Sequence, residues 1–525
     1  MTKRLQGLAR VAGQACLVGI AILALAGVCL SQAPSDWPQF HNANMQRSNP
    51  YETVLSVDNA GDLRKKWSYA IGRTDGSPIV ANGVVYIGAD NGVWYAVNAS
   101  NGALLWSYQT ASGTCCTAPT AAIANGVVYF GSLNGVVYAL NASTGAKLWS
   151  YQTAAGADIE SAPTVVNGVV YVGSNDGNLY AFDASTGALL WSYNTGNDGW
   201  CSPAVANGVV YVGSSNGNVY ALNGSSGALL WSYAGNVGWS SPAVADGVVY
   251  VVSGDNGAYY TPGNVYALNA STGAVLWSQS IGAGYPQSSS PAVANGMVYI
   301  GSGDGNVYAL NASTGAELWS YTTDSSNNVG GSPAVANGVV YIGNYSGVMY
   351  ALNASTGAGL WDYQPHGTYA ISSSPAVANG LVYVASTNGY LYAFGLPGPE
   401  LSLRAVAYPT PTVPGGLLTY ALKVWNKSSE KAVHEVLTTS VPAGTTFSSI
   451  ELSGTVGLGS CTTPAVGASG SVVCKENSVM KPGSTWTVRL TVEVMATAGT
   501  VLSETATASS DNLASSSVTA QNTVH

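Results

Sequence analysis

Charged side chains are scarce in this chain. Only 8% of the 525 residues are Asp, Glu, Lys or Arg, and Gly, Ser, Asn and Thr supply the surface polarity instead. The net charge is −9, and no cluster of basic residues occurs anywhere. Nucleic acids and anionic membrane surfaces are held mainly by clustered positive charge. The composition therefore argues against both as partners.

The common catalytic motifs are also missing. The sequence contains no GxSxG, HExxH or Walker motif, no CxxC pair for zinc and no CxxCH haem site. There are four histidines, scattered at His41, His366, His434 and His525. Catalysis centred on histidine therefore has no support, because the proton-transferring groups must lie within hydrogen-bond reach of one another.

A repeated stretch dominates what is present. Its proline recurs at intervals of 39 to 49 residues. Periods of this size indicate propellers, solenoids or arrays. The repeat prolines are Pro78, Pro119, Pro163, Pro203, Pro242, Pro291, Pro333 and Pro375.

The repeat that runs from Ser202 to Tyr233 shows what one unit contains. Asn207-Gly208 is the dipeptide of a tight primed hairpin turn, and it separates two short β-branched runs. Two further turns, SNG and GSSG, are followed by NVYALN-type and ALLWSY-type runs. Four short antiparallel strands with no helical period predict one propeller blade.

A tryptophan marks the fourth strand of each unit. The first of them precedes the first repeat proline, and the last repeat stops after three strands. We therefore expect residues 63–70 to supply the fourth strand of the final blade, which closes a ring of eight blades and hides its edges. Packing between blades is the expected role of these residues: Trp67, Trp106, Trp149, Trp191, Trp231, Trp277, Trp319 and Trp361.

Both ends of the chain have a different composition. Residues 1–33 combine a basic start with a long apolar run, as in a secretory signal peptide, although lipidation at Cys29 or an uncleaved anchor are alternatives. Residues 396–400 indicate a linker, and residues 401–525 alternate as in a β-sandwich. Cys461 and Cys474 flank a short loop there and are expected to form a disulfide, worth about 3 kcal/mol.

The segments ending at the repeat tryptophans, such as YALNASTGALLW, resemble the tryptophan-docking motif of the pyrroloquinoline quinone (PQQ) propeller family. The residues from Asp36 to Phe40 (DWPQF) and from Arg47 to Pro50 (RSNP) resemble the segment that leads into the propeller of PQQ-dependent alcohol dehydrogenases. The resemblance implies an all-β, eight-bladed propeller over residues 34–395. It implies less about function, because the family also includes a non-enzymatic outer-membrane assembly lipoprotein.

The same resemblance suggests cofactor-binding residues. Cys115 and Cys116 match an adjacent-cysteine pair above the quinone, Trp239 matches the tryptophan below it, and Asp255 or Asn256 lies where a calcium ligand is expected. The chain departs from the family elsewhere. The turn at residues 175–177 has no glutamate, and no carboxylate follows Trp277 where the catalytic aspartate is expected, so no catalytic residue is assigned.

The position three residues before each repeat proline varies more than the rest of the unit. It should lie in the connection between blades, at one mouth of the central channel, where indoles and polar groups could bind a small planar or sugar-like ligand. Free drift of connecting loops is the alternative. Asp75 and Glu160 are weaker candidates as metal ligands, Cys115-Cys116 is either a strained disulfide or two thiols, and Cys201 should be packed. The mouth positions are Asp75, Cys116, Glu160, Trp200, Trp239, Ser288, Gly330 and Ser372.

The region after the linker resembles the conserved repeat domain of bacterial surface proteins, an Ig-like module. The matching pieces include residues 419–426, residues 441–445 and Pro482-Gly483. We therefore expect a secreted, periplasmic or cell-surface protein, monomeric, with no membrane span after the leader. The preferred function is a scaffold that binds a small molecule or a cell-envelope protein. The alternative is a PQQ- and calcium-dependent alcohol dehydrogenase.

Overall fold

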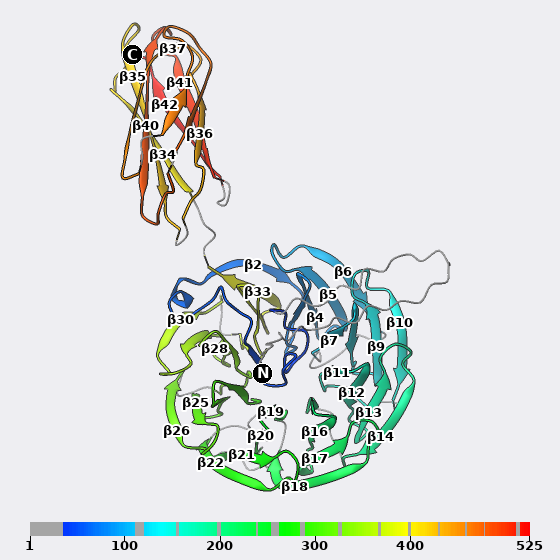
Figure 1. Cartoon of the computed structure of the whole chain (residues 1–525). Helices are drawn as coiled ribbons and strands as arrows, with labels where there is room; N and C mark the ends of the chain where they lie inside the picture. The colour runs from blue at the N-terminus through cyan, green and yellow to red at the C-terminus, as the bar shows by residue number, and fades with distance from the viewer. Residues whose placement is uncertain are drawn as a thin grey trace, which may run out of the picture.

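The protein is described by a computed structural model, and it consists almost entirely of β-strands (Figure 1). Eight sheets of four blade strands surround a central axis, and two further sheets form a second domain near the C-terminus. The structure describes residues 35–110, 120–153, 157–196, 201–237, 240–253, 262–283, 289–323, 328–365, 369–396, 401–428, 431–456, 459–476, 478–510 and 515–525.

Each blade follows the strand and turn pattern of its repeat. The innermost strands are β3 (Ile79–Ala81), β7 (Ala122–Ala124), β11 (Thr164–Val166), β15 (Ala204–Ala206), β19 (Ala243–Ala245), β23 (Ala292–Ala294), β27 (Ala334–Ala336) and β31 (Ala376–Ala378). The second strands are β4 (Val84–Gly88), β8 (Val127–Phe130), β12 (Val169–Gly173), β16 (Val209–Gly213), β20 (Val248–Val252), β24 (Met297–Gly301), β28 (Val339–Gly343) and β32 (Leu381–Ser386).

The third and outer strands complete each blade. The third strands are β5 (Val93–Asn98), β9 (Val136–Asn141), β13 (Asn178–Asp183), β17 (Gly217–Asn223), β21 (Pro262–Asn269), β25 (Asn306–Asn311), β29 (Met349–Asn353) and β33 (Tyr390–Gly395). The outer strands are β6 (Leu104–Gln109), β10 (Lys147–Gln152), β14 (Leu189–Asn194), β18 (Leu229–Val237), β22 (Val275–Ala283), β26 (Glu317–Thr322), β30 (Gly359–Tyr363) and β2 (Arg64–Ala70).

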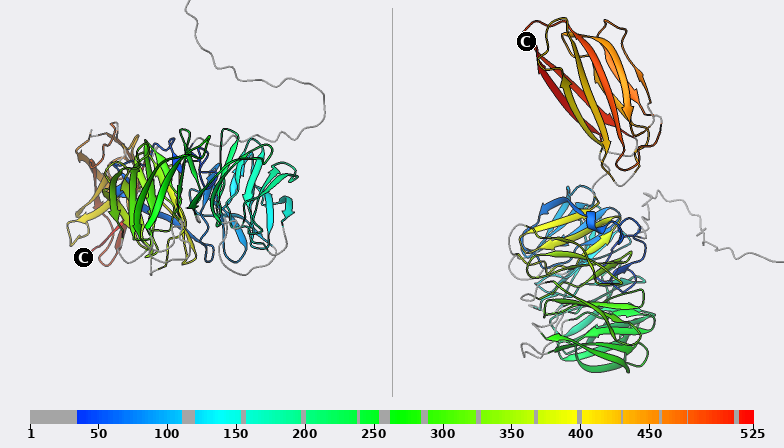
Figure 2. Two further views of the ribbon diagram at one scale, coloured as in Figure 1. Left: turned by 90° about the horizontal axis from the view of Figure 1, so that it is seen from below. Right: turned by 90° about the vertical axis from the view of Figure 1, so that its left-hand side faces the viewer.

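The ring closes on itself in two ways. The inner strands contact one another in sequence from β3 to β31, and β31 contacts β3 again. The outer strand of the last blade comes from the start of the chain, because β2 pairs antiparallel with β33 and places Trp67 opposite Ala393. Figure 2 shows the ring from its edge as a flat disc. The blades therefore form one closed β-propeller.

A tight turn joins the first two strands of every blade. In the fourth blade Asn207 has φ 51° and Gly208 has φ 78°. A type I′ turn needs positive φ at both central residues, and asparagine followed by glycine adopts it at low cost. The dipeptide thus fixes the register of the hairpin, with Ala204 opposite Tyr211.

The repeat tryptophans lock neighbouring blades together. Trp149 and Tyr129, both in the second blade, donate hydrogen bonds of 2.9 and 3.0 Å to the carbonyl oxygen of Ala184 in the third blade. A Cβ at Gly187 would lie 2.6 Å from the Trp149 ring, so only glycine allows the indole to lie this close. Equivalent tryptophan–carbonyl bonds occur at Ala99, Ala142, Gly224, Ala270, Ala312 and Ala354.

The seam between the seventh and eighth blades is different. The Tyr341 hydroxyl is buried without a hydrogen-bond partner, and the Trp361 ring packs edge-on against Phe394 at 5.1 Å between ring centroids. The short helix η1 (Ala60–Asp62) contacts β30 at this seam. At the other seams the tryptophan binds a carbonyl in the turn that follows the third strand of the next blade. The last blade has no such turn, because the chain leaves it after Gly395.

The second domain contains two antiparallel sheets around one apolar core. The disulfide Cys461–Cys474 is present and joins directly opposed residues of two neighbouring strands, which confirms the predicted bridge. The first sheet has the order β34 (Leu401–Tyr408), β35 (Leu417–Asn426), β40 (Thr485–Val494), β37 (Thr445–Gly454), and the second has the order β38 (Ser460–Thr462), β39 (Ser471–Lys475), β36 (Val436–Ser440), β41 (Val501–Ser509), β42 (Ser516–Thr523).

Candidate functional site at the channel mouth

Two kinds of loop share one face of the ring. One kind connects an outer strand to the next inner strand, and the other joins the second and third strands of a blade. Backbone hydrogen bonds tie them together, for example from Asp90 to the carbonyl of Arg73 at 2.9 Å and from Tyr345 to that of Asn328 at 3.0 Å. We call this face the mouth, and the described positions Asp75, Glu160 and Ser372 lie in its loops.

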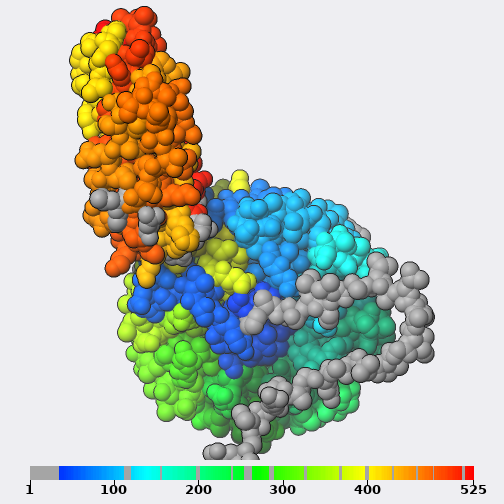
Figure 3. Space-filling model, turned by 45° about the horizontal axis from the view of Figure 1, so that its top comes forward, coloured from blue at the N-terminus to red at the C-terminus, as the bar shows by residue number. Residues whose placement is uncertain are grey.

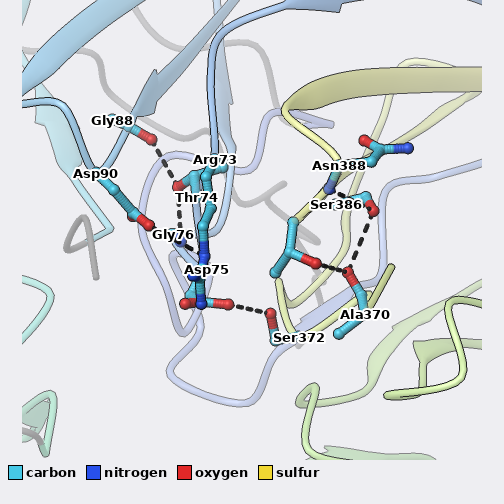
Figure 4. Close-up of polar contacts among 11 residues, drawn as sticks. Arg73, Thr74, Asp75, Gly76, Gly88, Asp90, Ala370, Ser372, Ser386 and Asn388 are labelled. Atoms are coloured by element: carbon cyan, nitrogen blue, oxygen red, sulfur yellow. Dashed lines mark hydrogen bonds and ion pairs between the residues drawn. The ribbon is translucent and has the colours of Figure 1, made fainter. Parts of the chain in front are cut away.

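Asp75 and Ser372 are neighbours at the mouth, although 297 residues separate them in the sequence (Figure 4). The Ser372 hydroxyl donates to Asp75 Oδ1 across the junction between the last and first blades. Beside them, the Thr74 hydroxyl donates to the Gly88 carbonyl at 2.8 Å and accepts from the Gly76 backbone N–H at 2.9 Å. Asp75 is therefore bound within a hydrogen-bonded junction.

Glu160 lies at the equivalent position in the third blade. Asn175 Nδ2 donates to Glu160 Oε2 at 3.0 Å. In the same turn, the Tyr180 hydroxyl donates to Asp176 Oδ2 at 2.6 Å. Burial is the main cause that raises the pKa of Tyr180 above its usual range, and the bond to Asp176 raises it further. The phenol therefore remains a donor at any physiological pH.

The sixth blade repeats the tyrosine–aspartate pair. The Tyr308 hydroxyl donates to Asp304 Oδ2 at 2.7 Å. Burial, followed by this bond, raises the pKa of Tyr308 to about 12. Asp75, Glu160, Asp176 and Asp304 thus accept hydrogen bonds from neighbouring side chains, and Asp75 and Glu160 are not brought together as a pair by any described contact.

Seven of the other predicted site positions lie outside the described residues. These are Cys115, Cys116, Trp200, Trp239, Asp255, Asn256 and Ser288. Cys201, next to them, is described: it carries no disulfide and is buried in the core, in agreement with the expected packing role. Within the described ranges, no group of three or more His, Cys, Asp or Glu residues is arranged to hold a metal ion.

Residues 35–49, which we call the lead-in segment, lie across the middle of the ring (Figure 3). They contact every inner strand or the residues just before it. The short strand β1 (Ser48–Asn49) even pairs parallel with β27. The eight hydrogen-bonded partners, at 2.8 to 3.4 Å, are Val80, Ile123, Val165, Ser202, Val244, Val293, Val335 and Val377.

Arg47 is the most unusual residue of the lead-in segment, because its guanidinium is wholly buried without a carboxylate. It donates to the backbone carbonyls of Phe40 at 2.6 Å and Pro333 at 2.9 Å, and to those of Ser332 and Pro375 at 3.3 and 3.4 Å. Burial lowers its pKa to about 9, so it stays charged at neutral pH. Its hydrogen bonds therefore connect the lead-in segment to the last two blades.

His41 lies near this charge and is neutral. Burial and the nearby Arg47 lower its pKa to about 3. Its Nε2 lies 3.4 Å from the Ser202 carbonyl, and its Nδ1 is buried without a partner.

The lead-in segment closes the channel on the side of the tight asparagine–glycine turns. Its residue Asp36 accepts a hydrogen bond of 3.0 Å from the backbone N–H of Asn82, which belongs to such a turn.

Sequence reasoning missed a ring of hydroxyls inside the mouth. The serine that precedes most repeat prolines accepts a hydrogen bond of 2.9 to 3.0 Å from the backbone N–H of the same position in the preceding blade. Ser–Pro in six of the eight repeats was the available signal. The acceptors are Ser77, Ser202, Ser241, Ser290, Ser332 and Ser374, and Thr120 takes this role for Ser77 at 3.1 Å.

Comparison with known proteins places this architecture in a family. Residues 51–194 and 175–397 match the family described as outer membrane protein assembly factor BamB. The chain belongs to this PQQ-like repeat family. Over 79 residues it is also 32% identical to the dehydrogenase subunit of a quinone-type alcohol dehydrogenase from Gluconobacter oxydans strain 621H. That match covers 14% of this chain, which spans only 10% of the relative's length.

Solved structures of the PQQ-like propeller confirm the fold. BamB from Moraxella catarrhalis has a TM-score of 0.52 at 20% identity, over 63% of this chain and 99% of that one. The quinohemoprotein alcohol dehydrogenase ADHIIG from Pseudomonas putida HK5 has a TM-score of 0.58 at 20% identity, over 73% and 83%. A europium-containing methanol dehydrogenase has a TM-score of 0.58 at 18% identity, over 69% and 98%. At such identities the likeness shows the fold alone.

Proposed function

We propose that this protein is an exported scaffold whose propeller mouth binds a small ligand or a cell-envelope protein, without catalysis of its own. The observation that carries the proposal is the state of the mouth acids. Asp75, Glu160 and Asp304 accept hydrogen bonds from side chains of the ring itself. A general base must reach the proton it abstracts, and these carboxylates are engaged in holding the mouth together.

The closure of the channel by the lead-in segment supports the same proposal. Its hydrogen bonds to all eight blades leave the mouth as the face of the ring that a ligand or partner can approach. A rigid ring with variable loops on one face is typical of binding proteins, because the scaffold fixes the geometry and the loops supply specificity.

The disulfide in the second domain supports export of the protein. Disulfides persist in the periplasm and outside the cell, and the reducing cytosol disfavours them. None of the helices in the described ranges is long and apolar enough to cross a membrane. We propose that the second domain is an Ig-like spacer that holds the propeller away from its point of attachment, and that the chain acts as a monomer.

A PQQ- and calcium-dependent alcohol dehydrogenase is the second candidate, and the quinone-type relatives favour it. No calcium ligand set is assigned among the described mouth residues, because Asp75, Glu160 and Asp304 already accept hydrogen bonds from side chains of the ring. The residues that the resemblance assigns to the cofactor, such as Cys115, Cys116 and Trp239, lie outside those ranges. No catalytic step through the quinone is therefore derived.

Reconstitution separates the two functions. The full chain is incubated with PQQ and calcium, and reduction of an electron-accepting dye is followed with primary alcohols. The scaffold proposal predicts no alcohol-dependent reduction above a PQQ-only blank. Dye reduction that requires the protein, PQQ and alcohol together would overturn the proposal and establish the dehydrogenase.

A further inference from the structure

The second domain holds two acidic residues inside its core, far in sequence from the mouth. Glu435 is 1% exposed and Glu476 is 3% exposed. Each continues the core-facing row of its strand. Glu435 lies two residues before the buried Leu437 of β36, and Glu476 lies two residues after the buried Cys474 of β39.

The two glutamates are directly opposed in the strand register. β36 and β39 pair antiparallel with Val436 opposite Lys475, and the Glu476 N–H donates to the Glu435 carbonyl at 2.9 Å. Opposed residues of an antiparallel pair have Cβ atoms about 4.5–5.5 Å apart on the same face of the sheet. Like charges in this arrangement repel each other, so the pair needs a compensating positive charge or a proton.

Most of the carboxylate oxygens at this place have no partner. Both oxygens of Glu435 and Oε2 of Glu476 are buried without a hydrogen bond, and only Oε1 of Glu476 is bound, by the backbone N–H and hydroxyl of Ser478. Burial is the main cause that raises the pKa of Glu435, and the neighbouring Glu476 raises it further, while backbone N–H groups and the adjacent His434 lower it. Lys475, on the adjacent position of β39, is exposed on the opposite face.

A third buried acid in the same core shows how an acid is held there without a second carboxylate. Glu504, on β41, accepts a hydrogen bond from the Thr439 hydroxyl and has no opposed acidic residue, since Ala520 faces it. The Glu435–Glu476 pair differs because it brings two acids together and leaves three of their four oxygens unpartnered, whereas Glu504 leaves only Oε2 unpartnered.

We propose that Glu435 and Glu476 form a calcium site that closes this end of the second domain. The donors are hard carboxylate oxygens, and no cysteine thiolate or imidazole lies within the pair, which favours calcium over zinc. Calcium accepts irregular oxygen geometry and completes its shell with carbonyls and water, whereas magnesium demands a near-ideal octahedron. With only two carboxylates, we expect a dissociation constant of about 10⁻⁴–10⁻³ M, as in extracellular modules.

Calcium binding is tested with the full chain. Isothermal titration with calcium chloride at pH 7 should show saturable binding in this range, weaker for magnesium. Calcium should also raise the melting temperature of the second domain by about 3–6 °C over a chelator-treated sample. Hydrogen exchange should slow in peptides that cover β36 and β39, which locates the ion without any substitution.

Substitutions provide the matched comparison. Glu435→Gln and Glu476→Gln should each weaken calcium binding at least tenfold, and Glu504→Gln should leave it unchanged. The proposal is overturned if the wild-type chain shows neither calcium binding nor slowed exchange in β36 and β39, which would mean that the pair shares a proton. It is equally overturned if both variants fold and still bind calcium with the wild-type constant, because the ion would then lie elsewhere, such as at the mouth loops.

Discussion

At the scale of single residues, the repeat tryptophans combine three interactions in one side chain. The Trp277 indole donates to the Ala312 carbonyl at 2.9 Å, lies 6.0 Å from the Tyr250 ring centroid, and covers Gly315 so closely that a Cβ there would approach to 2.5 Å. Removal of such a ring leaves a cavity between two blades and also leaves a carbonyl with one donor fewer.

Trp277→Ala should therefore cost about 3–5 kcal/mol of unfolding free energy, as large-to-small substitutions in packed sites do. Trp239→Ala, at the predicted mouth position, should change stability by less than about 1 kcal/mol and weaken ligand stacking instead. Denaturant unfolding of both variants measures the difference. Equal losses would show that Trp239 belongs to the core and would remove it from the mouth.

Asp183 occupies the turn position that is asparagine in most other repeats. Hydrogen bonds from Ser185 and Thr186 lower its pKa to about 2. A lowered pKa in the folded state means that the ionised form stabilises the fold, and that this contribution disappears as the pH falls through about 2.

Asp183→Asn should therefore leave the melting temperature unchanged near pH 7, because asparagine makes the same turn at Asn141 and Asn311. Between pH 4 and 2 the variant should lose less stability than the wild-type chain. Thermal melts at several pH values test this, and parallel curves for the two proteins would contradict the role assigned to the carboxylate.

At the scale of elements, two features hold the mouth and the channel in shape. The serine ring joins the inner strands of successive blades, and the lead-in segment crosses them on the other side. Both depend on hydrogen bonds between buried groups, which are costly to leave without a partner. Single substitutions should therefore reveal each of them.

Ser290→Ala removes the acceptor of the Ser241 backbone N–H, a bond of 3.0 Å between two buried residues. The loss should be about 1–3 kcal/mol, the usual cost of an unpaired buried polar group. Ser225→Ala, in an exposed turn, is the matched control and should change stability by less than about 0.5 kcal/mol. Equal effects in denaturant unfolding would show that the ring contributes nothing.

Arg47→Met removes the donor of four backbone carbonyls, three of them buried, while it keeps most of the side-chain volume. We expect a loss of about 3 kcal/mol or more, together with proteolytic release of the lead-in segment. Arg404→Met, at an exposed position of β34, serves as the control. An Arg47 variant that resists proteolysis as the wild-type chain does would contradict the account of this segment.

The sequence predicts the blades well because each repeat carries its own local signals. Asn207-Gly208 sets a turn, the β-branched runs set the strands, and the register follows. The path of the lead-in segment has no such pattern, since its partners lie as far away as Val377 and depend on a ring that must first close. The repeat pattern predicts where the mouth lies. Contacts within it, such as that of Ser372 with Asp75, depend on how the last blade meets the first, and these are far apart in the sequence.

The second domain shows a similar division. Its disulfide follows from two cysteines that flank one short loop, so Cys461 and Cys474 could be paired from the sequence. The opposed pair of Glu435 and Glu476 depends on the register between β36 and β39, which joins strands about forty residues apart along the chain. Alternation alone places each glutamate on a face, and it cannot say which residue lies opposite.

At the scale of the whole molecule, the faces of the ring have different tasks. The lead-in segment closes one side, the rim carries exposed leucines such as Leu190, and the mouth presents the variable loops. The central claim is that the partner or ligand meets the mouth. A photo-crosslinking amino acid at Tyr345, which is exposed on a mouth turn, samples that face, and one at Leu190 samples the rim.

The most direct test is a crosslinking capture with both variants of the full chain, expressed in the cell envelope of a bacterial host that supplies the partner. We predict crosslinked products from the Tyr345 position and none above background from the Leu190 position. Crosslinks confined to Leu190 would contradict the account, because the interaction surface would then be the rim of the propeller and not its mouth.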